Sequence, residues 1–281
     1  MKHVLLGAFA LMAANSAVVA ADLYQPSEPI PVAQPVEVSE ANGWYLRGDA
    51  GYSYNKSRGA WFFQGSNDTE SDFTTSSLRN SFTLGGGVGY QINNYLRTDA
   101  TLDYMFNGDF HGSTRGGGSA FGACTIACTS RDIASMTALS LLANAYVDIG
   151  TYGFVTPYVG AGLGGTYVKW GDLSNTSCAD NDSTNCDATE HHGGKGNWRF
   201  TYALMAGASI DITCSLKADV GYRYRRIEGG RMFDYKANGG PGYDRGLNSH
   251  EGRLGLRYMM GGCDQTAYMP PVEVPSAPVY K

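Results

Sequence analysis

Residues 43–54 read GWYLRGDAGYSY, and every second position of this stretch has the same chemical character. Trp44, Leu46 and Tyr52 share one face of an extended chain, whereas Arg47 and Asp49 share the other. Strict alternation of this kind is typical of a β-strand with one apolar and one polar face. The stretch therefore predicts a strand that separates two different environments.

Seven further stretches repeat this alternation. They cover residues 81–92, 96–106, 139–148, 155–164, 198–211, 216–225 and 251–260. Pro157 fits the pattern least well, because proline lacks the N–H group that a strand ladder uses and prefers the start of a strand. The sequence therefore predicts eight strands of one design.

The predicted connections fall into two length classes. Three are short turns, at 93–94, 150–153 and 213–214, and four are long and polar, at 55–77, 107–131, 170–196 and 228–246. Short turns at one end and long loops at the other are typical of outer-membrane barrels, whose short turns face the periplasm. The predicted fold class is all-β, an eight-stranded antiparallel transmembrane β-barrel with four long extracellular loops.

Segments of a different character flank the predicted barrel. Lys2 precedes a short apolar run, and small residues lead to Ala20 and Ala21, which is the layout of a secretory signal peptide. The prediction is a signal peptide at 1–21, a Pro-rich linker at 22–42, the barrel at 43–260 and a Pro-rich periplasmic tail at 261–281. We expect the exported chain in the outer membrane of a Gram-negative cell.

The overall composition agrees with this class. The chain of 281 residues has 38 glycines, 19 tyrosines and a mean hydropathy of -0.25. Such an average conceals the two faces of a barrel strand, because apolar outward positions and polar inward positions cancel. The net charge is -5 and basic residues do not cluster, so nucleic acid is not an expected partner.

The predicted inward faces carry acids and bases in nearly equal numbers. The acids are Asp49, Asp99, Asp103, Asp148, Asp211, Asp219 and Glu251, and the bases are Arg47, Arg97, Arg199, Lys217, Arg223, Arg225, Arg253 and Arg257. An unpaired charge inside a narrow barrel is costly, so the balance predicts an interlocking charge network. Eight strands leave an interior that side chains can fill. A filled interior is therefore favoured over an open pore.

Six cysteines in an exported chain predict disulfides. Spacing favours the local pairs Cys124–Cys128 and Cys178–Cys186, which leaves Cys214–Cys263 as a long-range pair. A zinc site is the alternative for the first pair, but neither a CxxC motif nor a histidine stands at ligand spacing. No metal-binding residue is therefore predicted.

Two short motifs suggest functions whose structural context is missing. Residues 160–165, GAGLGG, match the dinucleotide-binding pattern GxGxxG, but no helix is predicted after them. Residues 47–49, RGD, spell a tripeptide that adhesion receptors recognise, but the alternation directs Arg47 and Asp49 inward. Neither motif changes the prediction, and no cofactor is expected.

Histidine is a common catalytic and ligand-binding residue, and three of the histidines are candidates for such a role. Ser249 and His250 are neighbours in sequence, but consecutive strand residues point to opposite faces. His191 and His192, beside Glu190, could bind a metal or haem iron in their loop, although solvated loop residues are the simpler interpretation. No catalytic residues are predicted, and the chain is not expected to be an enzyme.

Four stretches resemble the OmpA-like and opacity-protein-like surface-antigen barrels, in particular those of alphaproteobacteria. They are residues 43–52 (GWYLRGDAGY), 144–150 (NAYVDIG), 156–162 (TPYVGAG) and 253–260 (RLGLRYMM). The last resembles the terminal signal that the barrel assembly machinery reads. The tail after Met260 and the six cysteines depart from the usual family pattern. The resemblance implies outer-membrane lipid and lipopolysaccharide as surroundings, with a host surface or peptidoglycan as further partners.

Three functions stay open at this point. The first is a structural surface protein, in which a plugged barrel supports loops that contact the outside. The second is a small pore for ions or polar solutes. The third is ligand capture by the loops, with haem or an adhesion partner as the ligand and His111, His191 and His192 as candidate groups.

Overall fold

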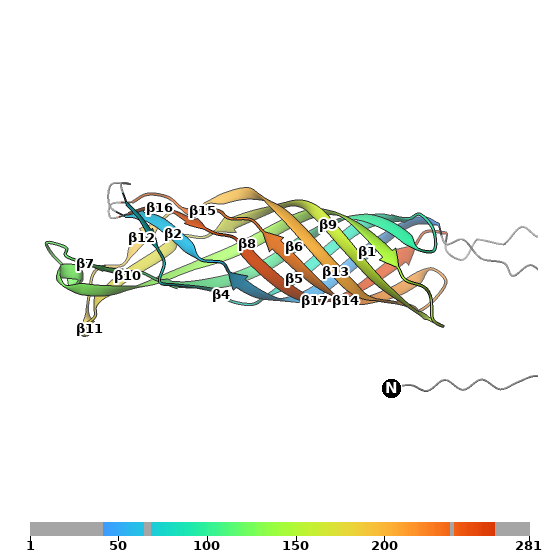
Figure 1. Ribbon diagram of the computed structural model, residues 1–281, viewed down its shortest axis with the longest axis horizontal. Coiled ribbons are helices and arrows are strands. Elements are labelled where there is room, and N and C mark those ends of the chain that lie inside the picture. The colour runs from blue at the N-terminus through green and yellow to red at the C-terminus, as the bar shows by residue number, and fades with distance from the viewer. Residues whose placement is uncertain (1–41, 65–68, 237–238, 262–281) are drawn as a thin grey trace, which may run out of the picture. The chain divides into compact units, whose positions relative to one another are not determined.

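The computed structural model describes residues 42–64, 69–236 and 239–261, and Figure 1 shows how their strands are arranged. The main sheet has 13 strands, of which eight are long and antiparallel. They are β1 (Gly43–Ser57), β5 (Ser81–Gln91), β6 (Leu96–Ser113), β8 (Ala127–Asp148), β9 (Val155–Trp170), β13 (Gly196–Asp211), β14 (Leu216–Ile227) and β17 (Leu247–Met259). Each pairs with the next, and β17 pairs with β1, so the pairings run in a ring. The predicted all-β, antiparallel fold is confirmed.

Exposure along these strands follows the predicted period of two. In β1, Tyr45, Arg47 and Asp49 are buried, whereas Trp44 and Leu46 are exposed. The exposed large side chains of all eight strands are mainly apolar or aromatic, which is the surface that strands present to lipid. Polar side chains are accordingly turned inward, as the alternation predicts.

The short connections stand where the sequence predicts them. β5 leads into β6 through residues 92–95, and β13 leads into β14 through residues 212–215. Tyr45 pairs with Met259, so β1 begins and β17 ends at this same end of the sheet. Pro157 lies near the start of β9, opposite Ala208, where its missing N–H does least harm.

The long connections differ from the prediction, because they contain strands. These are β2 (Ala60–Gln64), β3 (Thr69–Asp72), β4 (Thr75–Leu78), β7 (Arg115–Gly117), β10 (Leu173–Ala179), β11 (Asp182–Cys186), β12 (Glu190–His192), β15 (Gly230–Phe233) and β16 (Gly239–Asp244), with one 3₁₀ turn, η1 (Ala123–Thr125). β15, β16, β2 and β3 form a second sheet. Figure 1 shows these strands gathered at the end opposite the short turns, called the loop end below.

Several ring strands also reach further than predicted toward the loop end. β8 begins at Ala127 rather than at residue 139, and β9 ends at Trp170 rather than at residue 164. In the added part of β8 the outward positions include Arg131 and Thr129, which are polar or charged. The apolar–polar contrast that marks lipid-facing strands disappears there, so the sequence pattern did not reveal the extension.

A compact apolar cluster fills the loop end. Its buried members are Ala60, Phe73, Leu78, Met105, Phe110, Ala134, Met136, Ala138, Val168, Trp170, Leu173, Ile227, Met232, Phe233 and Leu247, and half-buried Phe62 packs against them. Phe110 meets Phe73 and Trp170 edge to face, with ring centroids 6.0 and 5.5 Å apart. The long connections therefore share one apolar core with the loop-end parts of the ring strands.

Parts of the predicted domain plan fall outside the described residues. They include the signal peptide, nearly all of the Pro-rich linker, almost the whole tail, and Cys263, so the pair Cys214–Cys263 stays a prediction. In the described part of the chain, no helix is long and apolar enough to cross a membrane.

We predict that Phe110→Ala destabilises the folded protein by about 3–5 kcal/mol, because it empties a buried aromatic site. The measurement is the midpoint of thermal unfolding in detergent, followed by the electrophoretic shift between folded and unfolded barrel. Phe121→Ala is the matched control, because that side chain is 88% exposed and its loss should change the midpoint little. Equal shifts for the two variants would show that the cluster does not support the fold.

Candidate functional site: the charged interior and the loop-end cavity

The inner face of the ring carries a continuous network of four arginines and four carboxylates. Its members are Arg47, Arg223, Arg225, Arg253, Asp49, Asp99, Asp103 and Glu251, all less than a tenth exposed. Arg47 bridges Asp49 and Asp99 at 2.7 Å each. Arg223 bridges Asp103 at 2.7 Å and Glu251 at 2.9 Å. Equal numbers of opposite charges make this cluster neutral.

Arg253 joins the two halves of this interior network. Its guanidinium lies 3.1 Å from Asp49 on β1 and 3.3 Å from Asp103 on β6, two strands that both pair with β5. The pairs connect strands that are far apart in sequence, since Asp103 is on β6 and Arg253 is on β17. Breaking one contact would therefore leave charges on several strands without compensation.

Two further arginines near the short turns combine ion pairing with aromatic packing. Arg97 pairs with Asp148 at 3.1 Å, and its guanidinium carbon lies 4.4 and 4.5 Å from the ring centroids of Tyr146 and Tyr158. Arg257 pairs with Asp219 at 3.2 Å. A cation held between aromatic faces is stabilised without further hydrogen-bond partners. This accounts for the two Arg97 nitrogens that lack hydrogen bonds.

The remaining predicted members do not join the network. Lys217 pairs with Asp211 at 2.6 Å at the short-turn end, where both side chains are partly exposed. Arg199 pairs at 2.7 Å with Asp244 of β16, at the loop end. Sequence reasoning missed Asp244 because β16 was expected to be a solvated loop.

The cavities along the interior differ widely in volume. A cavity of about 370 Å³ opens at the short-turn end beside Asp211 and Lys217, and one of about 630 Å³ opens at the loop end. Between them, the space beside Arg47 and Tyr146 measures about 10 Å³, and the space beside Phe110 about 20 Å³. Much smaller spaces therefore separate the two cavities at the ends.

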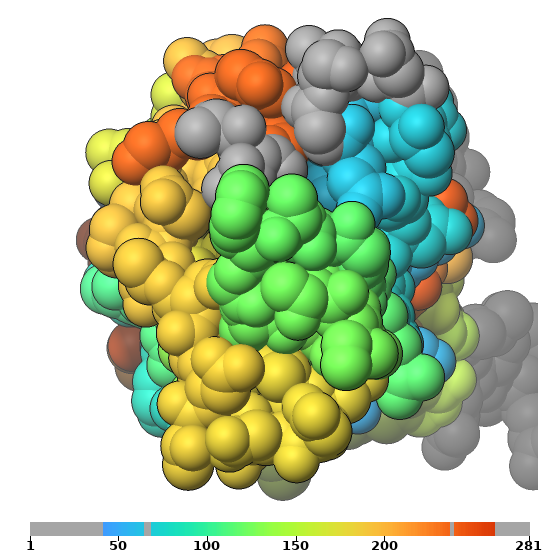
Figure 2. All heavy atoms as spheres, turned by 90° about the vertical axis from the view of Figure 1, so that its left-hand side faces the viewer, coloured from blue at the N-terminus to red at the C-terminus, as the bar shows by residue number. Residues whose placement is uncertain are grey.

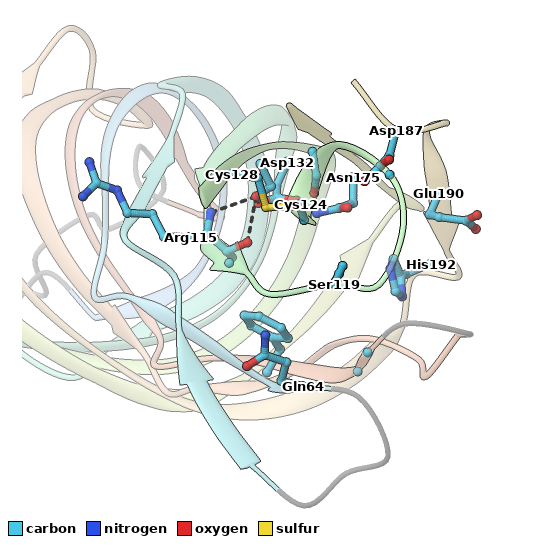
Figure 3. A pocket seen from close by; sticks show the side chains of 18 of the residues that line it. Gln64, Arg115, Ser119, Cys124, Cys128, Asp132, Asn175, Asp187, Glu190 and His192 are labelled. Atoms are coloured by element: carbon cyan, nitrogen blue, oxygen red, sulfur yellow. Dashed lines mark hydrogen bonds between the residues drawn. A yellow bond between two sulfur atoms is a disulfide. The ribbon is translucent and has the colours of Figure 1, made fainter. Parts of the chain in front are cut away.

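The loop-end cavity is lined by the added strands and by the extension of β8. Its floor is apolar, with Phe62, Phe73 and Phe233, and its wall carries Asp132 and Asn175. Figure 3 shows Asp132 and Asn175 close together beside the Cys124–Cys128 disulfide, with Arg115 extending away from them. Seen from this end in Figure 2, residues 115–131 (green) lie between the 170–196 connection (yellow) and β2 (cyan).

Asp132 differs from every other buried carboxylate that the structure describes. There are eight of them, and the other seven each lie 2.7 to 3.2 Å from an arginine. Asp132 instead accepts hydrogen bonds from the Ser130 hydroxyl, at 2.6 Å, and from the Asn175 amide. Burial raises the pKa of Asp132, and these hydrogen bonds offset only part of that rise.

The three histidines that are candidates for ligand capture, His111, His191 and His192, do not lie together. His192 is buried, with its ring 5.2 Å from that of Phe233, whereas His191 is exposed on the opposite face of β12. Burial lowers the pKa of His192. His111 is exposed on β6. Among the described residues, no group of three or more His, Cys, Asp or Glu side chains is placed to hold a metal ion.

Both local disulfides are present in the structure and lie in neighbouring segments. Cys124 and Cys128 are bonded at 1.95 Å, and Cys178 and Cys186 at 1.93 Å. Cys128 on β8 pairs in register with Ala179, next to Cys178 on β10. The Asp187 carboxylate also accepts the Ala123 N–H at 2.8 Å. The outermost segments are therefore fastened to one another.

An apolar outward face and a charge-paired inward face are the marks of a protein that crosses the outer membrane with strands. The chain belongs to the outer membrane protein beta-barrel domain family, which it matches over residues 5–259. Its location is accordingly the Gram-negative outer membrane.

Relatives extend this assignment. Uncharacterized proteins of Brucella abortus are 36% identical over 277 residues, covering 88% of this chain and 94% of theirs. A Rickettsia bellii protein named "Putative adhesin" is 28% identical over 217 residues, covering 77% of this chain and 83% of its own.

Solved outer-membrane structures give weaker similarities. Neisserial surface protein A has a TM-score of 0.43 at 18% identity, covering 78% of this chain and 97% of its own. OprG from Pseudomonas aeruginosa has a TM-score of 0.48 at 11% identity, covering 79% and 98%.

We predict that two isosteric changes of buried carboxylates differ in their effect on the stability of the folded protein. Asp103→Asn leaves Arg223 and Arg253 short of negative charge and should cost about 3–5 kcal/mol of stability. Asp132→Asn removes a carboxylate that has no arginine, so stability at neutral pH should not fall. Unfolding midpoints in detergent compare the two, with Asp109→Asn, an exposed pair member, as control. A large loss in Asp132→Asn would contradict this assignment.

The pH dependence of the loop end follows from the same group. Because folding raises the pKa of Asp132, its favourable contribution is present at low pH and is lost as the pH rises through the folded-state pKa. We expect amide hydrogen exchange in β8 and β10 to quicken, relative to Asp132→Asn, as the pH rises from about 4 to 7. Both proteins carry His192→Gln, because Asp132 raises the pKa of His192 and the variant would otherwise change that group as well. A ratio independent of pH would show that Asp132 ionises normally.

Proposed function

We propose that the ring of eight strands is a closed transmembrane barrel whose short turns lie in the periplasm and whose loop end projects from the cell. In this orientation the protein is a surface protein of the envelope, and its interior does not conduct. The observation that carries the proposal is the braced loop end, which has its own apolar core, a second sheet and two disulfides. Rigid loops on a barrel are suited to contact with molecules outside.

The filled interior supports the absence of conduction. The charge network occupies the middle of the barrel, and the apolar cluster lies between it and the loop-end cavity. A hydrated ion would have to displace several buried ion pairs and then cross apolar side chains. Neither layer offers a free charge that could replace the ion's water.

Contact with other cells is the function that the loop end supports best. Phe121 and Ile126, at the tip held by the Cys124–Cys128 disulfide, are 88% and 73% exposed. Large apolar side chains held in a fixed position outside lipid are suited to protein contacts. The name of the Rickettsia relative agrees with an adhesive role.

We expect the refolded full-length protein to be electrically silent in a planar lipid bilayer, because the network and the cluster together fill the interior. Folding is checked beforehand by the electrophoretic shift of the unheated sample. Reproducible single-channel steps from folded protein would overturn the closed interior and make a small pore the leading function.

The contact function is tested on a non-adherent laboratory strain that displays the full chain. Attachment to cultured animal cells should rise, and replacing residues 116–126 by Gly-Ser-Gly should remove most of that rise. Tyr152→Ser is the control, because this exposed side chain lies at the short-turn end and its change should leave attachment unaltered. Attachment that is unchanged by loss of the tip would exclude the tip as the contact surface.

A further inference from the structure

The outer face of three neighbouring strands is arranged in rows that change character toward the loop end. In the register of β1, β17 and β14, Ala50, Leu254 and Val220 form one row, and Tyr52, Gly252 and Tyr222 form the next. The two rows above are Tyr54, His250 and Tyr224, then Lys56, Asn248 and Arg226. An apolar surface thus passes through an aromatic row to a polar one, as at the edge of a lipid layer.

The polar row presents hydrogen-bond donors. Lys56 is exposed and forms no ion pair with the carboxylates that the structure describes. Arg226 is held by Glu228 at 3.2 Å and donates to the Asn248 side-chain oxygen at 3.1 Å. Tyr224 donates to that same oxygen at 3.2 Å. Because the oxygen is occupied twice, Asn248 offers its N–H groups to a further partner.

The aromatic row below adds an oriented histidine. The Tyr222 hydroxyl and His250 Nδ1 are 2.6 Å apart, and the Tyr224 ring centroid lies 5.3 Å from that of His250. Tyr54 flanks His250 on the other side and is 58% exposed. These contacts fix the imidazole ring, and its second nitrogen, Nε2, forms no hydrogen bond with the described residues.

Gly252 leaves an opening on the outward face of β17, one row below His250. A Cβ atom at Gly252 would have no heavy atom within 4 Å. Tyr52 and Tyr222 stand on either side, on β1 and β14, and Leu254 continues below, 67% exposed. This opening, called the groove below, is therefore one residue long on β17, between His250 toward the polar row and Leu254 toward the short turns.

We propose that this strip binds one phosphorylated acyl glycolipid of the outer leaflet, with the phosphate at Lys56, Asn248 and Arg226 and one acyl chain over Gly252. The row offers cations and neutral donors, and its one nearby carboxylate, Glu228, is already engaged by Arg226. Charged donors recognise phosphate oxygens strongly. The acyl groove beneath identifies the phosphate as that of a lipid rather than a free anion.

The inference rests on the proposed orientation, since the loop end must be the outer one for this strip to meet outer-leaflet lipid. Binding in detergent does not depend on the orientation, so the two can fail separately. The protein is the refolded full chain, and the probe is bisphosphorylated lipid A, with bound lipid counted by native mass spectrometry. Dephosphorylated lipid A and inorganic phosphate form the comparison arms.

Two variants remove parts of the strip, and two matched variants leave it intact. Lys56→Gln removes the unpaired cation, and Gly252→Leu fills the groove. Lys169→Gln removes an exposed outward lysine of β9 whose cross-strand neighbours are Thr137 and Gly196. Gly48→Leu adds the same side chain at an outward glycine of β1 that also has no heavy atom within 4 Å of its Cβ position. Gly48 lies two rows closer to the short turns than Gly252.

We expect Lys56→Gln to weaken lipid A binding about fivefold, Gly252→Leu to weaken it at least as much, and both controls to bind as the unchanged protein does. Dephosphorylated lipid A should bind weakly and should not distinguish Lys56→Gln, and inorganic phosphate should not compete. Equal losses in the controls, tight binding of the dephosphorylated lipid, or competition by phosphate would each overturn the proposal. If Gly252→Leu fails to fold, Lys56→Gln against Lys169→Gln decides alone.

Discussion

The buried pairing of guanidinium and carboxylate groups is the interaction on which the rest of the structure depends. Strands that face lipid outside must put their polar side chains inside, and a barrel this narrow gives those side chains little water. Seven arginines and eight carboxylates are buried in the described residues, and seven of the carboxylates lie beside an arginine. Removing one partner would leave an uncompensated charge, so the pairs fix which strands can be neighbours.

The eighth carboxylate shows where this constraint ends. Asp132 lies on the extension of β8, beyond the lipid-facing band, and is held by neutral donors from Ser130 and Asn175. Burial without a cation raises its pKa, which favours the neutral form more than in an exposed carboxyl group. The loop end thus follows the rules of a soluble core, with apolar packing and disulfides, rather than those of the charged interior.

The sequence was sufficient for the parts of the fold where two faces meet different environments. Alternation located the long strands, and it placed Arg47, Asp103 and Glu251 on inward faces, where these side chains are buried. The sequence was insufficient where both faces of a strand are polar or small, as at Thr129 and Ser130. The pattern therefore predicts loops where the structure has β7 and β10 to β12. The partner of Arg199, Asp244, and the isolation of Asp132 depend on those strands, and no local signal marks them.

The same division of environments bears on function. Inward residues such as Asp219 and Trp170 already belong to ion pairs or to the apolar cluster, so specific recognition there would require these contacts to be broken. The two outward surfaces are different, since the braced tip and the strip beside Gly252 are formed by side chains that the fold leaves exposed. A barrel stabilised from within can vary these surfaces at little cost to stability. We therefore expect the functional residues on the outer surface, where the side chains take no part in the interior contacts.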